Sequence, residues 1–256
     1  MAFLPESRPY TPANTDTGVI DAGLRGYMLR VYNWMSSGLL LTGIVAYTVA
    51  NTSLANLFYT SGYNARGLAV TQPTILGWAA MFAPLVFTLV LSFGVNRMSP
   101  TTVQALFWAF AATMGASLAN IFVVYAGASI TSVFFITAGT FAAMSLYGYT
   151  TKTDLTRFGS FLIMGLIGIL IAGLVNMFIQ SSMLQFVISV VGVLVFVGLT
   201  AYDTQRIKGD YMEHAYAEGT DGAAVRSVFD ALSLYLNFIN LFMLLLNLFG
   251  SRNSNN

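Results

Sequence analysis

The sequence contains few charged residues and no cysteine. Only 8% of its 256 residues are Asp, Glu, Lys or Arg, whereas a soluble globular domain carries about 25%. With 11 basic and 10 acidic side chains, the chain has too little polar surface to fold as a soluble body of this size. This composition excludes a soluble enzyme, a disordered chain and a nucleic-acid-binding protein with a basic face. The net charge of +1 also implies no general attraction to nucleic acid or to other acidic partners.

Motifs of catalysis and metal binding are missing as well. Without cysteine the chain has no disulfide framework, no thiolate nucleophile and no thiolate metal site. Its single histidine, His214, lies in a polar stretch and has no second histidine with which to bind a metal. The patterns G-x-S-x-G, H-E-x-x-H and the P-loop do not occur. We therefore expect a protein that is not an enzyme and holds no cofactor, with an intramembrane hydrolase as a remote alternative.

Long apolar runs dominate what is present. Hydrophobic residues make up 56% of the chain, and its mean hydropathy is +0.71. The runs that contain no charged residue are 31–65, 67–96, 98–151, 158–202 and 231–251. A helix needs about 20 residues to cross the hydrocarbon core of a bilayer. The runs 98–151 and 158–202 are therefore long enough for a hairpin of two crossings, and the other three for one crossing each.

These runs predict an all-α integral membrane protein, a bundle of seven transmembrane helices. Turn residues place the helices at about 29–50, 74–95, 102–125, 129–150, 158–180, 183–205 and 225–249. Strands are disfavoured because the runs are continuously apolar, whereas a membrane barrel shows alternating segments. Residues 1–24 contain three prolines and no apolar core, so we expect a flexible cytoplasmic tail there. The membrane domain is then 25–250, followed by a short C-terminal tail at 251–256.

The distribution of lysine and arginine predicts the orientation. In the seven-helix arrangement, nine of the 11 basic residues lie on the side of the N-terminus, and Arg66 and Arg252 lie on the other. Because basic residues accumulate in cytoplasmic loops, the N-terminus is expected in the cytoplasm and the C-terminus across the membrane. A re-entrant last segment, which would return the C-terminus to the cytoplasm, stays open as an alternative.

The last predicted helix carries a stripe of polar residues. Its members are spaced three, four, three and seven residues apart, which places them on one helix face: Asp230, Ser233, Asn237, Asn240 and Asn247. A carboxyl group and three amides are costly against lipid, so this face should point to the interior of the bundle or to a wet cavity. The stripe is either a chain of interhelical hydrogen bonds that fixes packing or the wall of a permeation path.

A second exceptional carboxyl group is Asp203, which directly follows the uncharged run 158–202. By the length of its span it lies at the cytoplasmic end of the sixth helix. Arg206 lies three residues later on the same helix face, and the topology places Arg97 on the same side of the membrane. Asp203 is either a solvated interfacial charge or the partner of one of these arginines.

Two segments of the chain resemble the Bax inhibitor family, the transmembrane Bax inhibitor motif proteins. They are Ala201-Tyr202-Asp203-Thr204-Gln205-Arg206-Ile207-Lys208 and Ala231-Leu232-Ser233-Leu234-Tyr235-Leu236-Asn237-Phe238-Ile239-Asn240-Leu241-Phe242, and the likeness extends over about 25–250. The resemblance implies a bundle in which the seventh helix is central and wrapped by the other six. It also implies a calcium leak activity that responds to pH, in bacterial members as well as in members of eukaryotic internal membranes.

The resemblance further implies a gate of three residues. In this family two carboxylates form a proton-sensing dyad, and an arginine latches the closed state; these positions fall on Asp203, Asn237 and Arg97. An amide cannot share a titrating proton, so this sequence departs from the family at Asn237. Asp230 lies two turns earlier on the same face, about 10 Å along the helix axis, which is too far for a direct replacement.

We expect from this a cation leak path gated by a contact between Arg97 and Asp203, in a bacterial inner membrane. Asp203, with amide oxygens from Asn237 and Asn240, would form a weak site for calcium, a hard cation that prefers oxygen. Because the repulsion between two carboxylates is absent, the pH response should shift to lower pH or disappear. The alternative is a non-conducting regulatory protein that binds another membrane protein, such as a quality-control protease.

Overall fold

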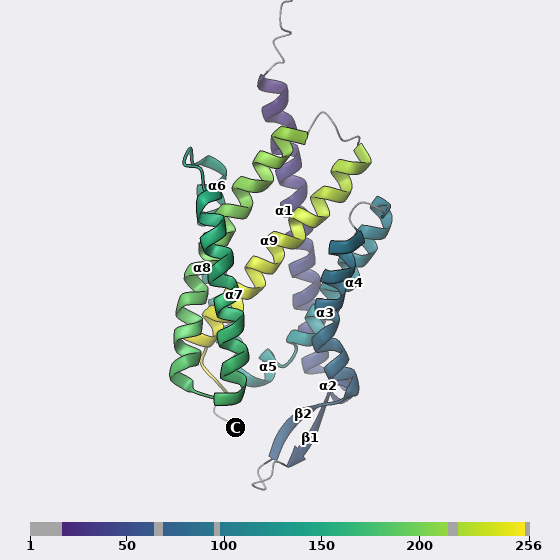
Figure 1. Ribbon diagram of the computed structural model, residues 1–256. Helices are drawn as coiled ribbons and strands as arrows, with labels where there is room; N and C mark the ends of the chain where they lie inside the picture. The colour runs from purple at the N-terminus through teal and green to yellow at the C-terminus, as the bar shows by residue number, and fades with distance from the viewer. Residues whose placement is uncertain (1–16, 64–68, 95–97, 215–219, 254–256) are drawn as a thin grey trace, which may run out of the picture.

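The computed structural model describes residues 17–63, 69–94, 98–214 and 220–253 (Figure 1). The elements run in the order α1 (Thr17–Asn51), α2 (Ala55–Phe58), β1 (Tyr59–Tyr63), β2 (Ala69–Pro73), α3 (Ile75–Gly94), α4 (Pro100–Leu118), α5 (Ile121–Val124), α6 (Gly127–Thr150), α7 (Thr156–Ile179), α8 (Ser182–His214) and α9 (Thr220–Phe249). Among the described residues, five helical segments are long and apolar enough to cross a membrane: α4 together with α5, α6, α7, α8 and α9. The predicted all-α membrane fold is confirmed at this level.

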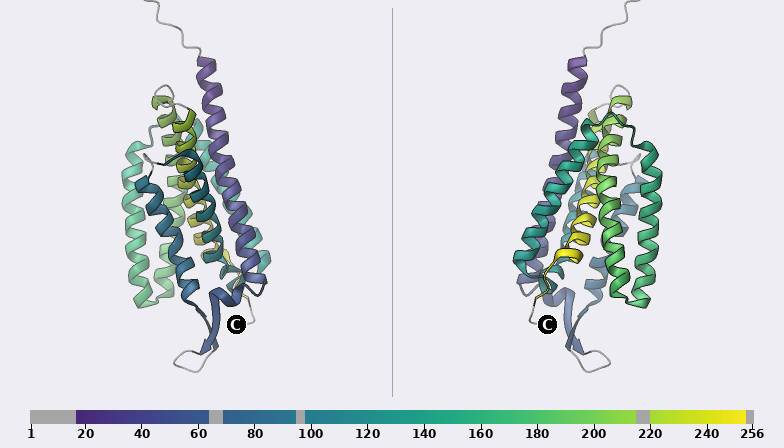
Figure 2. Two further views of the ribbon diagram at one scale, coloured as in Figure 1. Left: turned by 90° about the vertical axis from the view of Figure 1, so that its right-hand side faces the viewer. Right: turned by 90° about the vertical axis from the view of Figure 1, so that its left-hand side faces the viewer.

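Helix α9 is the most enclosed of these five segments. Figure 1 and Figure 2 show α9 running obliquely between a group formed by α6, α7 and α8 and a group formed by α1, α3 and α4. It packs against α1, α4, α6 and α8. In the most apolar stretch of α9, 56% of the residues are buried. The corresponding share for α7, which packs mainly on α8, is 6%. Helix α9 is therefore largely surrounded by other helices, while most side chains of α7 face outward.

Aromatic packing holds α9 against α1 and α4. Tyr235 of α9 is fully buried and makes edge-to-face contacts with Phe107 and Phe110 of α4, with ring centroids 6.3 and 5.2 Å apart. Its hydroxyl group lies 2.7 Å from Oγ1 of Thr42, which donates to the backbone oxygen of Ala111 at 2.8 Å. A buried tyrosine needs a partner for its hydroxyl group, so this chain joins α1, α4 and α9 at one point.

The tight turns between the helices follow from local sequence. Ser99 caps α4, since its Oγ accepts from the backbone N–H of Thr102 at 3.3 Å, and Pro100 occupies the first turn, where no N–H is needed. Helix α7 ends at Gln180, which has a left-handed backbone with φ of 53°. The side chain of Asn176 then accepts from the N–H of Ser181 at 3.0 Å and donates to Gln185 at 3.1 Å. Asn176 thereby satisfies the N–H of Ser181 just after the end of α7 and ties the turn to the start of α8.

Two predicted boundaries are wrong. Helix α1 begins at Thr17, so residues 17–24 are helical and not part of a tail; the remainder of the predicted tail, 1–16, lies outside the described residues. Helix α8 continues to His214 and α9 begins at Thr220, whereas the predicted helices end at about 205 and begin at about 225. The prediction used apolar length, which marks where a helix leaves the hydrocarbon core but not where it ends in water.

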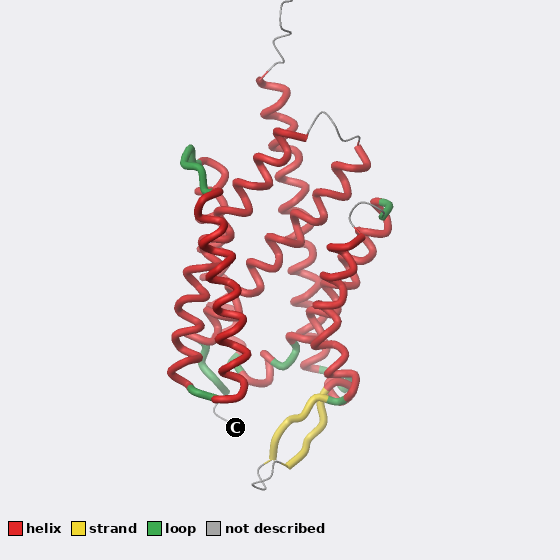
Figure 3. The backbone as a smooth tube through the Cα atoms, in the orientation of Figure 1, coloured by secondary structure: helices red, strands yellow, loops and turns green. Residues whose placement is uncertain are grey.

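The end of the bundle away from Thr17 carries structure that the sequence did not predict. The predicted connection between α1 and α3 contains an antiparallel hairpin, in which β1 pairs with β2 from Tyr59 opposite Pro73 to Tyr63 opposite Ala69 (Figure 3). Near this end, the predicted C-terminal tail pairs with the connection before α6. The N–H of Ala126 donates to the oxygen of Ser251 at 3.0 Å. Residues 254–256 of that tail lie outside the described residues.

Two glycines allow α6 and α7 to approach α8 closely. A Cβ atom on Gly148 of α6 would lie 2.2 Å from the backbone oxygen of Ala201, and one on Gly159 of α7 would lie 2.4 Å from the ring of Tyr202. Small residues permit such close contacts between membrane helices, where van der Waals packing drives association. Both contacts surround the segment that begins at Ala201, so they determine where Asp203 is placed.

We predict that Gly148→Ala destabilises the protein by roughly 1–3 kcal/mol, because α6 must move away from a backbone atom of α8. Gly139→Ala is the matched control on the same helix, since a Cβ there meets nothing within 4 Å. Thermal unfolding of both variants in one detergent measures the difference. Equal unfolding temperatures would show that the close approach of α6 and α8 does not limit stability.

Candidate functional site

The carboxylate of Asp203 lies between α8 and α9 and is held by side chains from α9. The residue is only 8% exposed. Its Oδ2 accepts hydrogen bonds from Nδ2 of Asn237 at 2.7 Å and from Oγ of Ser233 at 3.0 Å. A buried carboxylate without such partners would be very costly, so these two hydrogen bonds offset the cost of burying it.

The charge of Asp203 is balanced by Arg206 on the next turn of α8. Nη2 of Arg206 lies 3.0 Å from Oδ1 of Asp203 and also donates to Oγ of Ser233 at 3.3 Å. The arginine side chain is 40% exposed, whereas that of the aspartate is 11% exposed. The pair thus reaches from the surface of the bundle to its interior, and both carboxylate oxygens are occupied. Of the alternatives left open for Asp203, pairing with Arg206 is the one observed.

Neighbouring polar residues of the same α8 segment bond to other elements. Oγ1 of Thr204 lies 3.0 Å from Oγ of Ser145 on α6. Gln205 donates to the oxygen of Thr153 and accepts from the N–H of Leu155, each at 2.8 Å, and so holds the connection between α6 and α7. Lys208 donates to the oxygen of Tyr149 at 2.9 Å. The polar residues of the segment from Ala201 to Lys208 therefore have a structural role, because they bond α8 to neighbouring elements.

Asp230, the second carboxyl group of the predicted site, has a separate environment. It is 8% exposed, and its Oδ2 accepts from the hydroxyl group of Tyr27 on α1 at 2.6 Å. The ring of Tyr27 stacks near that of Tyr211 of α8, with centroids 4.8 Å apart. Arg206 also acts electrostatically on Asp230. The two carboxyl groups therefore have different hydrogen-bond partners.

The polar stripe of α9 is divided between two environments. Asp230 and Asn237 are buried and Ser233 is half-buried, as predicted for a face that points inward. Asn240 is exposed, and its Nδ2 donates to the backbone oxygen of Leu236 at 2.8 Å. Asn247 is exposed as well, and its Oδ1 accepts from Tyr125 at 3.1 Å. The structure does not bring Asn240 to Asp203, because α9 turns that residue away from α8.

The predicted calcium site would be built around the Asp203 carboxylate, whose two oxygens are bonded to Asn237, Ser233 and Arg206. The Asp203 carboxylate and the Ser233 hydroxyl group lie within hydrogen-bonding distance of each other, whereas Asn237 presents its amide nitrogen, Nδ2, to the carboxylate. Within the described ranges, no group of three or more His, Asp or Glu side chains could hold a metal ion. Only one carboxylate is present, so strong calcium binding is not expected here. The predicted latch residue Arg97 lies outside the described residues.

Several residues that build this site escaped the sequence analysis. Tyr27, Tyr32 and Ser145 contact the polar network, with the hydroxyl groups of Tyr32 and Ser145 bonded to each other. Tyr27 is 203 residues away from Asp230 along the chain, and Ser145 is 59 away from Thr204. A single sequence carries no signal for pairs so far apart. The one available hint was that hydroxyl groups in apolar helices tend to bond across helix interfaces.

Comparisons with known proteins agree with these features. Residues 24–254 match the family model described as inhibitor of apoptosis-promoting Bax1. The chain is 45% identical over 232 residues to the inner membrane protein YbhL of Escherichia coli, covering 90% of this chain and 94% of that protein. It is also 45% identical over 243 residues to an uncharacterised protein of Caulobacter vibrioides, covering 93% of this chain and 94% of that protein. To protein RP147 of Rickettsia prowazekii it is 44% identical over 248 residues, covering 95% of this chain and 98% of that protein.

We predict that Asn237→Ala destabilises the protein by roughly 1–3 kcal/mol, because a buried carboxylate loses a hydrogen-bond donor. Asn240→Ala, one turn further along α9, should change stability by less than about 0.5 kcal/mol, since Asn240 is exposed and bonds its own helix. Unfolding in detergent compares the two. In an Asp203→Asn background the cost of Asn237→Ala should fall, and an undiminished cost would contradict a direct coupling of the two side chains.

Proposed function

The chain belongs to the Bax inhibitor-1 family, and from this premise we propose that it forms a cation leak path in the bacterial inner membrane, with calcium as a permeant ion. Membership rests on a family match over residues 24–254 and on relatives that align along nearly their whole length. The location is supported by YbhL of Escherichia coli, which is named an inner membrane protein. The observation that carries the proposal is the buried, arginine-paired carboxylate of Asp203 against α9.

In the proposed topology seven helices cross the membrane, with α1 and α3 added to the five long apolar segments. Helix α1 contains the uncharged run that begins at 31, and α3 is apolar from Ile75 to Leu91. The N-terminus is then cytoplasmic, together with most lysine and arginine residues. Helix α9 is continuous over 30 residues, about 45 Å, and it reaches the end of the bundle opposite its start (Figure 2). This length supports a full crossing over a re-entrant segment, and the proposed topology has the C-terminus across the membrane.

The proposed gate is the network around Asp203. A cation that approaches the carboxylate competes with Arg206 for Oδ1 and with Ser233 and Asn237 for Oδ2. While these partners are in place, the negative charge is neutralised and the path is closed. Loss of the arginine contact would free one carboxylate oxygen for a cation, and a single carboxylate releases its ion readily. Arg97 remains a proposed second partner of Asp203.

Asn237 is proposed to make the leak less sensitive to pH than a pair of carboxylates would. Two carboxylates in contact repel each other, so one of them keeps a proton to higher pH, and their titration is coupled. Here the neighbour of Asp203 is a neutral amide that donates a hydrogen bond at 2.7 Å. The repulsion between two carboxylates is therefore absent, and we expect the response of the leak to pH to shift to lower pH or to disappear.

A second candidate function is a non-conducting regulatory protein that binds another membrane protein. The observation that favours it is that every oxygen of the Asp203 carboxylate already has a partner in the described structure, as in a network that only fixes packing. The two functions differ in one direct measurement. The purified protein in liposomes passes calcium under the first proposal and passes none at any pH under the second.

We predict that Arg206→Gln raises the calcium leak of proteoliposomes about two- to fivefold, the change expected from losing a partly exposed ion pair. Arg30→Gln is the control, because it removes the same charge from the same end of the bundle, and Arg30 is exposed. A calcium-sensitive dye inside the vesicles reports the flux. A leak that is unchanged in Arg206→Gln, or equally raised in both variants, would rule out Arg206 as a specific gate.

A further inference from the structure

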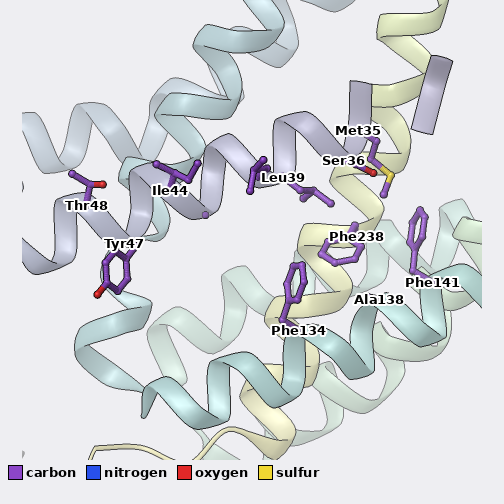
Figure 4. Close-up of a pocket in the computed structure, with 12 residues that line it drawn as sticks. Met35, Ser36, Leu39, Ile44, Tyr47, Thr48, Phe134, Ala138, Phe141 and Phe238 are labelled. Atoms are coloured by element: carbon purple, nitrogen blue, oxygen red, sulfur yellow. The ribbon is translucent and has the colours of Figure 1, made fainter. Parts of the chain in front are cut away.

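A long apolar groove runs between α1 and α6, away from the carboxylate network. Figure 4 shows its middle part, where side chains of α1 face Phe134 and Phe141 of α6, and Phe238 of α9 lies between them. This part has a volume of about 650 Å³, and cavities of about 450 and 350 Å³ adjoin it on either side. Neighbouring cavities share lining residues, Met35 and Phe141 on one side and Leu39 and Phe134 on the other. The three therefore form one continuous groove.

The groove is as long as a membrane is thick. Its lining residues on α1 extend from Arg25 to Thr48. At 1.5 Å per residue these 23 steps along the helix amount to about 35 Å, compared with about 30 Å for the hydrocarbon core. The size of each part falls within the range of small-molecule sites, about 300–1,000 Å³. An extended, flexible apolar chain fits this shape, whereas a compact ligand would leave most of it empty.

The inner wall offers apolar contact and few polar groups. Phe238 forms the floor, with its ring centroid 5.6 Å from those of both Phe134 and Phe141. The hydroxyl groups of Tyr32 and Ser145 are bonded to each other, so neither requires a ligand. Helices α1 and α6 both pack onto α9 and make few direct contacts with each other, and the groove lies between them.

Positive charge is found at one end of the groove only. Arg25 lines that end, and it has no acidic partner among the described side chains. Tyr149 lines the same end, and Nζ of Lys208 lies 5.0 Å from the centre of its ring. The cavity at the opposite end is lined by no charged residue. A ligand that complements the whole groove thus has an anionic group at one end and a long apolar chain.

We propose that this groove binds one anionic glycerophospholipid from the leaflet on the Arg25 side. Its phosphate lies at Arg25, and one acyl chain follows α1 past Met35 and Phe141 toward Phe238. Anionic lipid surfaces attract basic residues at the membrane boundary, and arginine suits the phosphate because its guanidinium group donates in a fork. This site is independent of the ion path, and it holds whether or not the protein conducts.

The test measures lipid binding to the full chain, purified and delipidated in detergent, by native mass spectrometry with added phosphatidylglycerol or phosphatidylcholine. Gly43→Phe fills the groove, because Gly43 lines it and a Cβ there meets nothing within 4 Å. Gly139→Phe is the control, since it is equally open but lies outside the groove. We expect Gly43→Phe to weaken phosphatidylglycerol binding roughly tenfold, because the acyl chain loses the contact of several methylene groups. Gly139→Phe should leave binding unchanged.

A second arm tests the headgroup. Arg25→Gln should weaken phosphatidylglycerol binding about fivefold, the contribution of one basic residue near an anionic lipid. It should leave the weaker binding of phosphatidylcholine unchanged, and Arg30→Gln should affect neither lipid. Equal binding of the two lipids by the unaltered protein, or equal phosphatidylglycerol binding by Arg25→Gln and Arg30→Gln, would overturn the proposal. This arm decides the matter even if Gly43→Phe does not fold.

Discussion

The structure depends on one buried charge, the carboxylate of Asp203, and on the need to satisfy it within a membrane. An ionised side chain in this position is tolerated only with partners, and three of them converge on it: Asn237, Ser233 and Arg206. Two of these partners lie on α9, so the charge fixes the rotation and height of α9 against α8. Gly148 and Gly159 let α6 and α7 pack closely against α8 at Ala201 and Tyr202, just before Asp203.

Helix α9 thereby connects two features that face different ways. Asn237 points to α8 and bonds to the carboxylate, while the next residue, Phe238, points to α6 and forms the floor of the apolar groove. A residue step of about 100° around a helix separates the two sides. The proposed leak path and the proposed lipid site therefore use two different faces of one buried helix.

Much of the fold could be predicted from the sequence, because the absence of charge over 20 or more residues is a direct signature of membrane crossing. Helices α6 and α7 begin and end within two residues of their predicted limits. The errors arose where water replaces lipid, at the start of α1 and the end of α8, since the apolar signal stops there. In the site, the motif located Asp203 and Asn237, and helix spacing suggested Arg206. The exposure of Asn240 and the contact of Tyr27 with Asp230 depend on long-range packing, which periodicity along one helix does not encode.

In the proposed leak path, the neutral amide of Asn237 beside Asp203 sets the response of the leak to protons. The most direct measurement is calcium flux in proteoliposomes from pH 5 to pH 8 for the unaltered protein and for Asn237→Asp, with Asn240→Asp as the control at an exposed position. A second carboxylate at 237 would contact Asp203 and titrate with it, so the account predicts that the pH midpoint moves upward in Asn237→Asp alone. An unchanged midpoint in Asn237→Asp would contradict it.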